Sequence, residues 1–196
     1  MKQDIVLAGV GGQGILTIAY IIDYAAQMSN LHFKQAEVHG MSQRGGAVQS
    51  HVRLSDQDIF SDLIPKGGAD IILSVEPLES LRYIDFLSPE GKIVVSRDPY
   101  VNIPDYPDLN KVLDTIKQSK YHVIVDSKKL SKDAGSPKSQ NIVMLGAASL
   151  FMILEEKLLV QSFQEFFTHK GEKIVEMNTK AFRLGREVAK DSQKAF

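Results

Sequence analysis

The chain has 196 residues, of which 43% are hydrophobic and 24% are charged, and this size and composition are typical of one globular domain. Its 23 Lys and Arg residues nearly balance its 24 Asp and Glu residues, so the net charge of −1 gives no electrostatic reason to bind nucleic acid or an anionic membrane. The absence of cysteine excludes disulfides, thiolate zinc sites, a cysteine nucleophile and cysteinyl ligation of an iron–sulfur cluster.

Neither a leader peptide nor a membrane span is expected. The apolar stretch at residues 5–8 is too short for a signal peptide, and the nearly apolar run at residues 142–154 is shorter than the roughly 20 residues that cross a bilayer. No repeat, low-complexity tract or change in composition marks a second domain. We therefore expect a single cytoplasmic domain over residues 1–196, with no nucleic-acid partner and no membrane partner.

The first forty residues have the pattern of a βαβ unit. Residues 5–8 are a short, wholly apolar run bounded by glycine, which is typical of a strand buried on both faces. From Gly14, apolar residues recur at helical spacing as far as Ala26, and Asn30 can end that helix. Residues 33–38 can form a second strand, so we expect a parallel sheet with helices on both faces.

Residues 48–54 break this pattern. Apolar and polar side chains alternate there, which favours a half-exposed strand over another buried parallel one. Residues 55–58 suit a turn, after which Ile59 and Phe60 could return as a short antiparallel partner. We therefore expect an antiparallel hairpin inserted into a mostly parallel sheet.

The βαβ pattern then resumes and gives way to helices. Strands are expected at 71–73, 93–95 and 123–125, helices from Pro77 and at 111–120, a turn at 89–91, a loop at 97–107, and a polar, flexible segment at 128–138. Residues 141–154 are too apolar for a surface helix, so we expect them inside the domain or against a partner. A last amphipathic helix is predicted by apolar residues at steps of three and four: Ile174, Met177, Ala181, Leu184 and Val188.

The first candidate site is the glycine-rich turn between the first strand and its helix. Gly9, Gly11 and Gly14 satisfy the spacing G-x-G-x-x-G, which lets a pyrophosphate approach the amides of a helix N-terminus. Glu37 lies where a dinucleotide-binding fold keeps its ribose-binding acid. The same glycines could instead only let the helix pack tightly against the strand, and Gln13 suits another backbone or a polar ligand as well as phosphate.

The second candidate is a polar loop after the second strand. It combines a hydroxyl, an amide, a fixed cation and two glycines, in the order Ser42, Gln43, Arg44, Gly45 and Gly46. It could bind an anion or a partner, or Arg44 could be a solvated side chain on a hairpin turn. His39, His51 and His122 lack metal-ligand spacing, and no Ser-His-Asp arrangement is apparent, so we assign no catalytic and no metal-binding residue.

Several ordered blocks of sequence resemble one family. They include Gly9-Val10-Gly11-Gly12-Gln13-Gly14-Ile15-Leu16, Glu37-Val38-His39-Gly40-Met41-Ser42-Gln43-Arg44-Gly45-Gly46, Ser50-His51-Val52-Arg53, Glu76-Pro77-Leu78-Glu79, Asn141-Ile142-Val143-Met144-Leu145-Gly146-Ala147, and Ala181-Phe182 with Gly185. Together they resemble the small, gamma-type subunit of the thiamine-diphosphate-dependent 2-oxoacid:ferredoxin oxidoreductases, most closely that of the indolepyruvate enzymes. The likeness runs from about residue 4 to about residue 186.

The resemblance implies a Rossmann-like, three-layer α/β domain with a helical C-terminal part that works inside a larger complex. It implies oxidative decarboxylation of aryl pyruvates such as indolepyruvate, with coenzyme A as co-substrate and ferredoxin as acceptor. Thiamine diphosphate, Mg and 4Fe-4S clusters are then expected on a large alpha subunit, and ferredoxin is reached through the complex. The cofactor-facing or partner-facing residues would be those of the two loops: Gly9, Gly11, Gly12, Gln13 and Gly14, with Ser42, Gln43, Arg44, Gly45 and Gly46.

Two other functions remain open from the sequence. A free-standing NAD(P)-dependent oxidoreductase would use Gly9, Gly11, Gly14 and Glu37, although the family resemblance gives no reason to expect bound nicotinamide. A non-catalytic nucleotide-sensing or scaffold module is the third possibility. In the subunit hypothesis, the buried helix from Asn141 and the final amphipathic helix would contribute docking surface for the partner.

Overall fold

The computed structural model describes residues 1–40, 45–101 and 103–194. Six strands are formed, β1 (Lys2–Val10), β2 (His32–His39), β3 (Ala47–Ser55), β4 (Ala69–Ser74), β5 (Leu87–Ser96) and β6 (His122–Val125). The α-helices are α1 (Ile15–Met28), α2 (Pro77–Arg82), α3 (Leu109–Ile116), α4 (Ser127–Asp133), α5 (Gln140–Ala148), α6 (Glu156–Thr168) and α7 (Glu172–Gln193). Short 3₁₀ turns follow α2 at Ile84–Phe86 and α5 at Ser149–Phe151.

The strands form one mixed sheet in the order β2-β3-β1-β4-β5-β6. β1, β4, β5 and β6 are parallel neighbours, whereas β3 is antiparallel to both β1 and β2. The sheet is therefore mostly parallel with an antiparallel hairpin, as the sequence predicted. The expected βαβ unit needs one correction, because β3 is inserted between β1 and β2, so the two strands that flank α1 are not neighbours.

The partner of β3 also differs from the prediction. Ile59 and Phe60 form no strand, and β3 pairs instead with β2, from His32 opposite Ser55 to His39 opposite Val48. The reason is length, since β2 and β3 match residue for residue along eight positions, whereas a two-residue return could offer few ladder hydrogen bonds.

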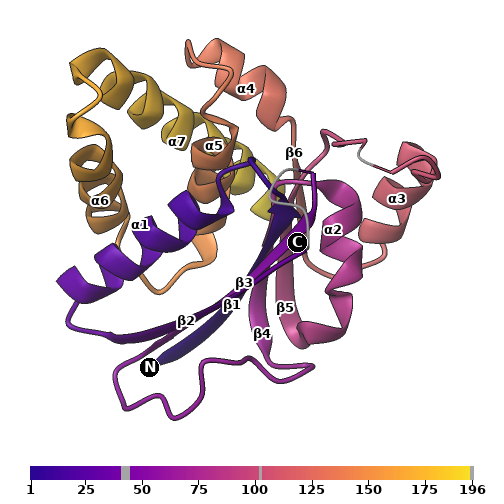
Figure 1. The fold of residues 1–196 in the computed structure, drawn as a ribbon, viewed down its shortest axis with the longest axis horizontal. Coiled ribbons are helices and arrows are strands. Elements are labelled where there is room, and N and C mark those ends of the chain that lie inside the picture. Colours follow the sequence, from indigo (N-terminus) through magenta and orange to yellow (C-terminus); the bar gives the residue numbers. More distant parts are fainter. Residues whose placement is uncertain (41–44, 102, 195–196) are drawn as a thin grey trace.

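Helices cover both faces of the sheet (Figure 1). On one face lie α1, α5, α6 and α7, whose core includes the inward side chains of β1 and β4. On the other face, α2 and α3 pack over β5 through Ile93, Val95 and Ile116. This makes the three layers that the sequence indicated.

The helix α5 is buried inside the domain. The sequence had predicted either this or burial against a partner. Every residue from Asn141 to Ala148 is buried, and α7 packs directly on it. The contact is close enough that a Cβ on Gly146 would lie 2.0 Å from the Phe182 carbonyl oxygen. The expectation that α5 offers docking surface is therefore wrong, because α7 occupies its outer face.

Two smaller expectations are also corrected. Residues 89–91 lie within β5 rather than in a turn, and the polar segment at 128–138 begins as helix α4. The carboxylate of Asp126 caps α4 by accepting the backbone N–H of Lys129 at 3.0 Å, a local signal for helix initiation. Among the described residues, no helix combines the length and the apolar character needed to cross a membrane.

Candidate functional site

The first glycine loop begins where β1 ends. Gly12 has φ +97° and Gly14 has φ +82°, a region of backbone conformation that favours glycine. Between them the side chain of Gln13 turns back on the loop, where its Oε1 accepts the Val10 N–H at 2.7 Å. Its Nε2 donates to the Val75 carbonyl oxygen at 3.4 Å. Gln13 therefore joins the end of β1 to the segment that follows β4.

Gly9 and Gly14 have packing roles. A Cβ on Gly9 would lie 2.5 Å from Val75 Cγ2, and a Cβ on Gly14 would lie 2.5 Å from Asn141 Nδ2. At both positions there is room for a hydrogen atom but not for a Cβ. Gly9 and Gly14 therefore allow the tight packing that was the alternative to phosphate binding. Gly12 differs, because nothing lies within 4 Å of the place where its Cβ would stand.

The second glycine loop lies directly beside the first. Ser42, Gln43 and Arg44 fall outside the described residues, and the expectation placed on them stays a prediction. Gly45 and Gly46 are described, and the Gly11 N–H donates to the Gly46 carbonyl oxygen at 2.8 Å. In return, the Gly45 N–H donates to the Gly11 carbonyl oxygen at 3.5 Å. The fold thus brings together two loops that are separated by about thirty residues in the sequence.

The position of Glu37 does not suit a dinucleotide site. A ribose-binding acid belongs at the end of a strand next to the first one, but Glu37 is on β2, with β3 between it and β1. Two strand spacings put it about 10 Å from β1, and its register partner is Ser50. One amide of the glycine motif, that of Gly11, is also already bonded to Gly46. The nicotinamide hypothesis therefore loses two of its requirements.

A pocket of about 640 Å³ opens beside the first glycine loop. Its walls come from the carboxyl ends of the parallel strands and from the start of α5: Gly12, Gln13, Val75, Asp98, Pro99, Tyr100, Lys128, Pro137, Lys138, Gln140 and Asn141. This is the edge at which α/β sheets bind their ligands. Two exposed lysines, Lys128 and Lys138, give its mouth positive charge.

The carboxylates of Asp98 and Glu76 hold the wall of this pocket in place. Asp98 Oδ2 accepts the Lys128 N–H at 2.7 Å and the Ser127 hydroxyl at 3.1 Å, which ties the end of β5 to the start of α4. Glu76 is buried, and its Oε1 accepts the Tyr100 N–H at 3.2 Å and the Tyr106 hydroxyl at 2.5 Å.

Burial, together with the hydrogen bond to Glu76, raises the pKa of Tyr106. Its phenol therefore stays protonated and can donate to Glu76. The loop between β5 and α3 is fastened at both Tyr100 and Tyr106, and this fixes the wall that carries Asp98.

Among the histidines that the sequence singled out, His51 has the clearest environment. His51 is buried on β3, and its Nδ1 accepts the Ile64 N–H at 2.9 Å. Burial lowers its pKa, with Arg53 adding to the effect, so it packs as a neutral imidazole. Within residues 1–40, 45–101 and 103–194, no cluster of three or more His, Asp or Glu side chains could hold a metal ion.

Sequence reasoning did not single out Lys128, Lys138 and Asp98, which line the pocket. The first two lie in the segment predicted to be polar and flexible, and Asp98 lies in the loop that crosses the surface. Their shared signal is position, because Asp98 and Lys128 each follow closely on a parallel strand, where binding residues of α/β sheets are found. Asn141 was noted in the sequence, but its contact with Gly14 could only be seen in the fold.

The fold and the site define an α/β domain with a pocket at the carboxyl ends of its parallel strands. The model of the pyruvate ferredoxin/flavodoxin oxidoreductase family matches residues 4–188, and the chain belongs to this family. Over 194 residues it is 36% identical to indolepyruvate oxidoreductase subunit IorB of Archaeoglobus fulgidus, a match that covers 94% of each protein.

Two solved structures have the same fold. The gamma subunit of a keto/oxoacid ferredoxin oxidoreductase from Geobacter sulfurreducens is 26% identical, with a TM-score of 0.69 over 96% of this chain and 99% of that one. A 2-oxoglutarate:ferredoxin oxidoreductase from Magnetococcus marinus, solved with 2-oxoglutarate, coenzyme A and succinyl-CoA bound, aligns with a TM-score of 0.78 and 22% identity. There the match covers 97% of this chain but 31% of that chain, so the same fold occurs both as a separate subunit and within a longer polypeptide.

Proposed function

We propose that this chain is the small subunit of an indolepyruvate:ferredoxin oxidoreductase. The near full-length similarity to an IorB subunit supports this, as does membership of the pyruvate ferredoxin/flavodoxin oxidoreductase family. The complex would cleave the bond between the carboxyl and carbonyl carbons of an aryl pyruvate and release carbon dioxide. The acyl group would pass to the sulfur of coenzyme A, whose thiol proton is released, and the two electrons would pass singly to two ferredoxin molecules.

The composition supports a division of labour within that complex. Iron–sulfur clusters need cysteine thiolates as ligands, and this chain has no cysteine. The 4Fe-4S clusters therefore belong to other polypeptides, and the large alpha subunit would carry them together with thiamine diphosphate and Mg. Residues 1–196 would serve as one gamma-type domain of that assembly, inactive by itself.

The two glycine loops and the neighbouring pocket are the part of this chain that would serve the reaction. The single observation that carries this assignment is that Gly11 and Gly46 are hydrogen-bonded at the same sheet edge where the pocket opens. Lys128 and Lys138 suit the phosphates of coenzyme A, because ammonium groups attract phosphate oxygens. Gly12 and Gln13 line the same pocket and would approach that ligand or the large subunit.

The proposal is tested by co-expressing the chain with the large subunit. Reduction of a viologen dye by indolepyruvate should depend on coenzyme A and on the presence of both chains. Equal activity from the large subunit alone would overturn the proposal. Saturable binding of NAD or NADP to this chain in calorimetry would favour the nicotinamide hypothesis instead.

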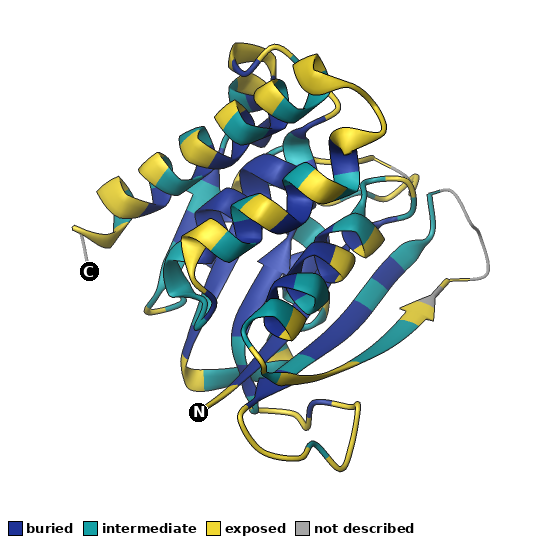
Figure 2. Ribbon diagram, turned by 90° about the vertical axis from the view of Figure 1, so that its left-hand side faces the viewer, coloured by how far each residue is buried: buried dark blue, intermediate teal, exposed yellow. Residues whose placement is uncertain are grey.

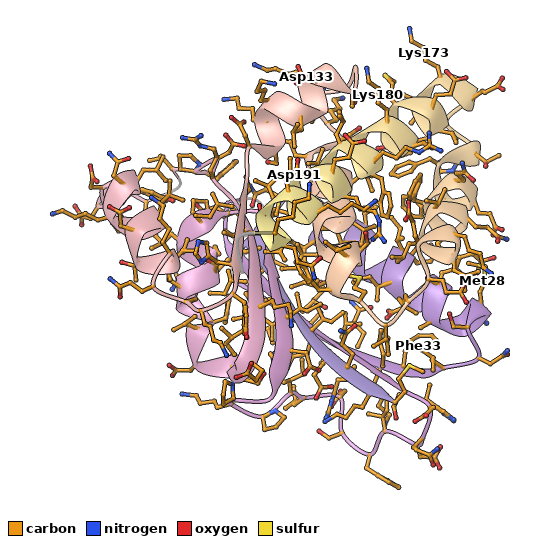
Figure 3. The ribbon with its side chains drawn as sticks, turned by 180° about the vertical axis from the view of Figure 1, so that it is seen from behind. Met28, Phe33, Asp133, Lys173, Lys180 and Asp191 are labelled. Atoms are coloured by element: carbon orange, nitrogen blue, oxygen red, sulfur yellow. The ribbon has the colours of Figure 1, made fainter. Side chains whose placement is uncertain are left out.

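The double variant Lys128→Ala with Lys138→Ala tests the pocket in the assembled enzyme. We expect the KM for coenzyme A to rise about tenfold, with kcat little changed, since the lysines would act in binding rather than in bond breaking. Lys173→Ala is the matched control, because Lys173 projects from the outer end of α7 (Figure 3). An unchanged KM in the double variant would remove coenzyme A from this pocket.

A further inference from the structure

A loop at the other end of the sheet exposes two large apolar side chains. This segment, residues 56–64, follows β3 and is called here the Phe60 loop. The side chain of Phe60 is 94% exposed and that of Leu63 is 57% exposed, whereas Ile64 is buried beneath them. Removing an aromatic ring from water is favourable, so a second surface that covers Phe60 would be stabilised by it.

The Phe60 loop is held in place by a buried ion pair. Arg53 Nη1 donates to the carbonyl oxygens of Ser61 and Leu63, each at 3.0 Å. The other side of the same guanidinium makes a two-pronged contact with the Asp4 carboxylate, at 2.8 and 3.0 Å. Asp4 is 1% exposed. Because the backbone that follows Phe60 is fixed in this way at Ser61 and Leu63, less conformational entropy is left to lose there on binding.

The rim of the loop is acidic. Asp56, Asp58 and Asp62 all lie within these nine positions. Asp56 pairs with the N-terminal ammonium at 2.6 Å, and Asp58 faces the His32 ring at 3.5 Å. A complementary surface would therefore be an apolar pocket edged by basic side chains.

The same charge argues against a second copy of this chain as the occupant. A two-fold dimer sets one patch against itself, and here it would bring acidic rim against acidic rim around Phe60. Like charges placed across an interface oppose association. The occupant is accordingly a different polypeptide.

Exposed apolar side chains continue from this loop toward the second glycine loop. Phe33 and Val38 of β2 are 40% and 60% exposed, and Figure 3 shows Phe33 at the edge of the sheet, near the end of α1 at Met28. Phe33 and Ile59 border the same shallow hollow. The edge strand β2 thus connects the Phe60 loop with Gly45 and Gly46.

We propose that the Phe60 loop is a docking point for the large subunit, which would receive Phe60 and Leu63 in an apolar pocket with a basic rim. This inference rests on the proposed function, because it takes the large subunit as the partner. The contact would continue along β2 to the glycine loops, so that one partner covers the sheet edge from end to end.

The test measures the affinity of the purified chain for the large subunit by surface plasmon resonance. The double variant Phe60→Ala with Leu63→Ala should bind about tenfold more weakly or worse, as expected for the loss of an interface anchor. Its thermal unfolding midpoint should stay at the wild-type value, because both side chains lie in solvent in the isolated chain. Tyr20→Ala, which truncates a half-exposed ring on the outer face of α1, should bind within about twofold of wild type.

A second variant tests the charge. Asp58→Asn with Asp62→Asn should slow association and weaken its dependence on salt, since exposed charges act mainly on the encounter rate. Wild-type affinity in the Phe60→Ala, Leu63→Ala variant would overturn the inference while leaving the proposed function intact. Failure of the wild-type chain to bind the large subunit would overturn both. The inference would also be overturned if the wild-type chain formed dimers that the Phe60→Ala, Leu63→Ala variant abolishes while binding of the large subunit is unchanged. A second copy of this chain would then be the occupant.

Discussion

The two halves of the sheet are built differently. In the parallel half, β4 has one side chain that is not fully buried, and β1 is buried from Gln3 to Val10. In the hairpin half, no side chain that the structure describes on β2 is buried. Figure 2 shows this contrast, with dark blue central strands and a teal and yellow strand at the edge.

The difference follows from what covers each half. The parallel strands lie between helices on both faces, whereas β2 is an edge strand on which α1 packs from one side. Burial of apolar surface is the main source of stability, so the parallel half holds the domain together. In the hairpin half, β3 still contributes Val48, Val52 and Leu54 to the core, whereas β2 offers surface at the edge of the sheet, where the second glycine loop and the Phe60 loop emerge.

Gly185→Ala should have the largest effect on stability, because it disrupts the close packing of α7 on the buried helix α5. A Cβ there would lie 1.9 Å from the Val143 carbonyl oxygen, so α5 and α7 would have to separate. We expect a loss of more than about 3 kcal/mol in the free energy of unfolding, measured with urea. Gly171→Ala is the control, since its Cβ meets open space and only the backbone strain at φ +94° should cost stability, by about 1–3 kcal/mol. Equal losses would mean that the α5–α7 contact is not tightly constrained.

Arg53→Ala tests the hairpin half and should have a smaller effect. The change leaves the Asp4 carboxylate buried, with Lys2 still 2.9 Å away, so we expect a loss of about 2–3 kcal/mol. Hydrogen exchange should also become faster in the Phe60 loop, where Arg53 binds the carbonyl groups of Ser61 and Leu63. Lys117→Ala, which breaks an exposed pair with Asp114, should cost less than about 1 kcal/mol. Unchanged exchange in the loop would contradict its anchoring by Arg53.

Asp23→Asn tests the cost of burying a carboxyl group on α1, the helix that packs on β2 and β3. Burial raises the pKa of Asp23 to about 7 in the folded chain, from 3.8. The folded state therefore holds this proton between pH 4 and pH 7 while the unfolded state has lost it, and stability falls as the pH rises through that window. Above pH 7 the wild type should be less stable than the variant, because its buried carboxylate is then ionised. Urea unfolding at pH 4 to 8 checks this, and parallel curves for the two proteins would contradict it.

Local patterns in the sequence predicted most elements. The apolar run at residues 5–8, the helical spacing after Gly14 and the alternation at 48–54 each appear in the structure as β1, α1 and β3. The pairing of β3 was predicted wrongly because it depends on β2, whose match with β3 along the whole strand outcompeted the short segment at Ile59. The alternation on β3 also predicted a half-exposed strand, and this was wrong, because Ser50 and His51 are buried on a strand that lies inside the sheet between β1 and β2. A strand's own pattern leaves the choice of neighbour open.

The sequence predicted the two glycine loops of the candidate site but not the residues that line the neighbouring pocket. The glycine spacing located the turn at residues 9–14, and the polar composition located the loop at 42–46. That Gly11 and Gly46 meet, and that Asp98 and Lys128 line the same pocket, follows from strands brought together by the fold.

The amino-acid sequence by itself determined the class of fold, the family and the impossibility of cysteine-bound clusters, because these depend on composition, short-range periodicity and ordered motifs. Tertiary structure alone decided that β3 separates β1 from β2, that α7 covers α5, and that Phe60 stands in solvent on an anchored loop. Each of these features depends on pairing and packing between segments that are distant in the chain. Local sequence patterns do not report the energies of such contacts.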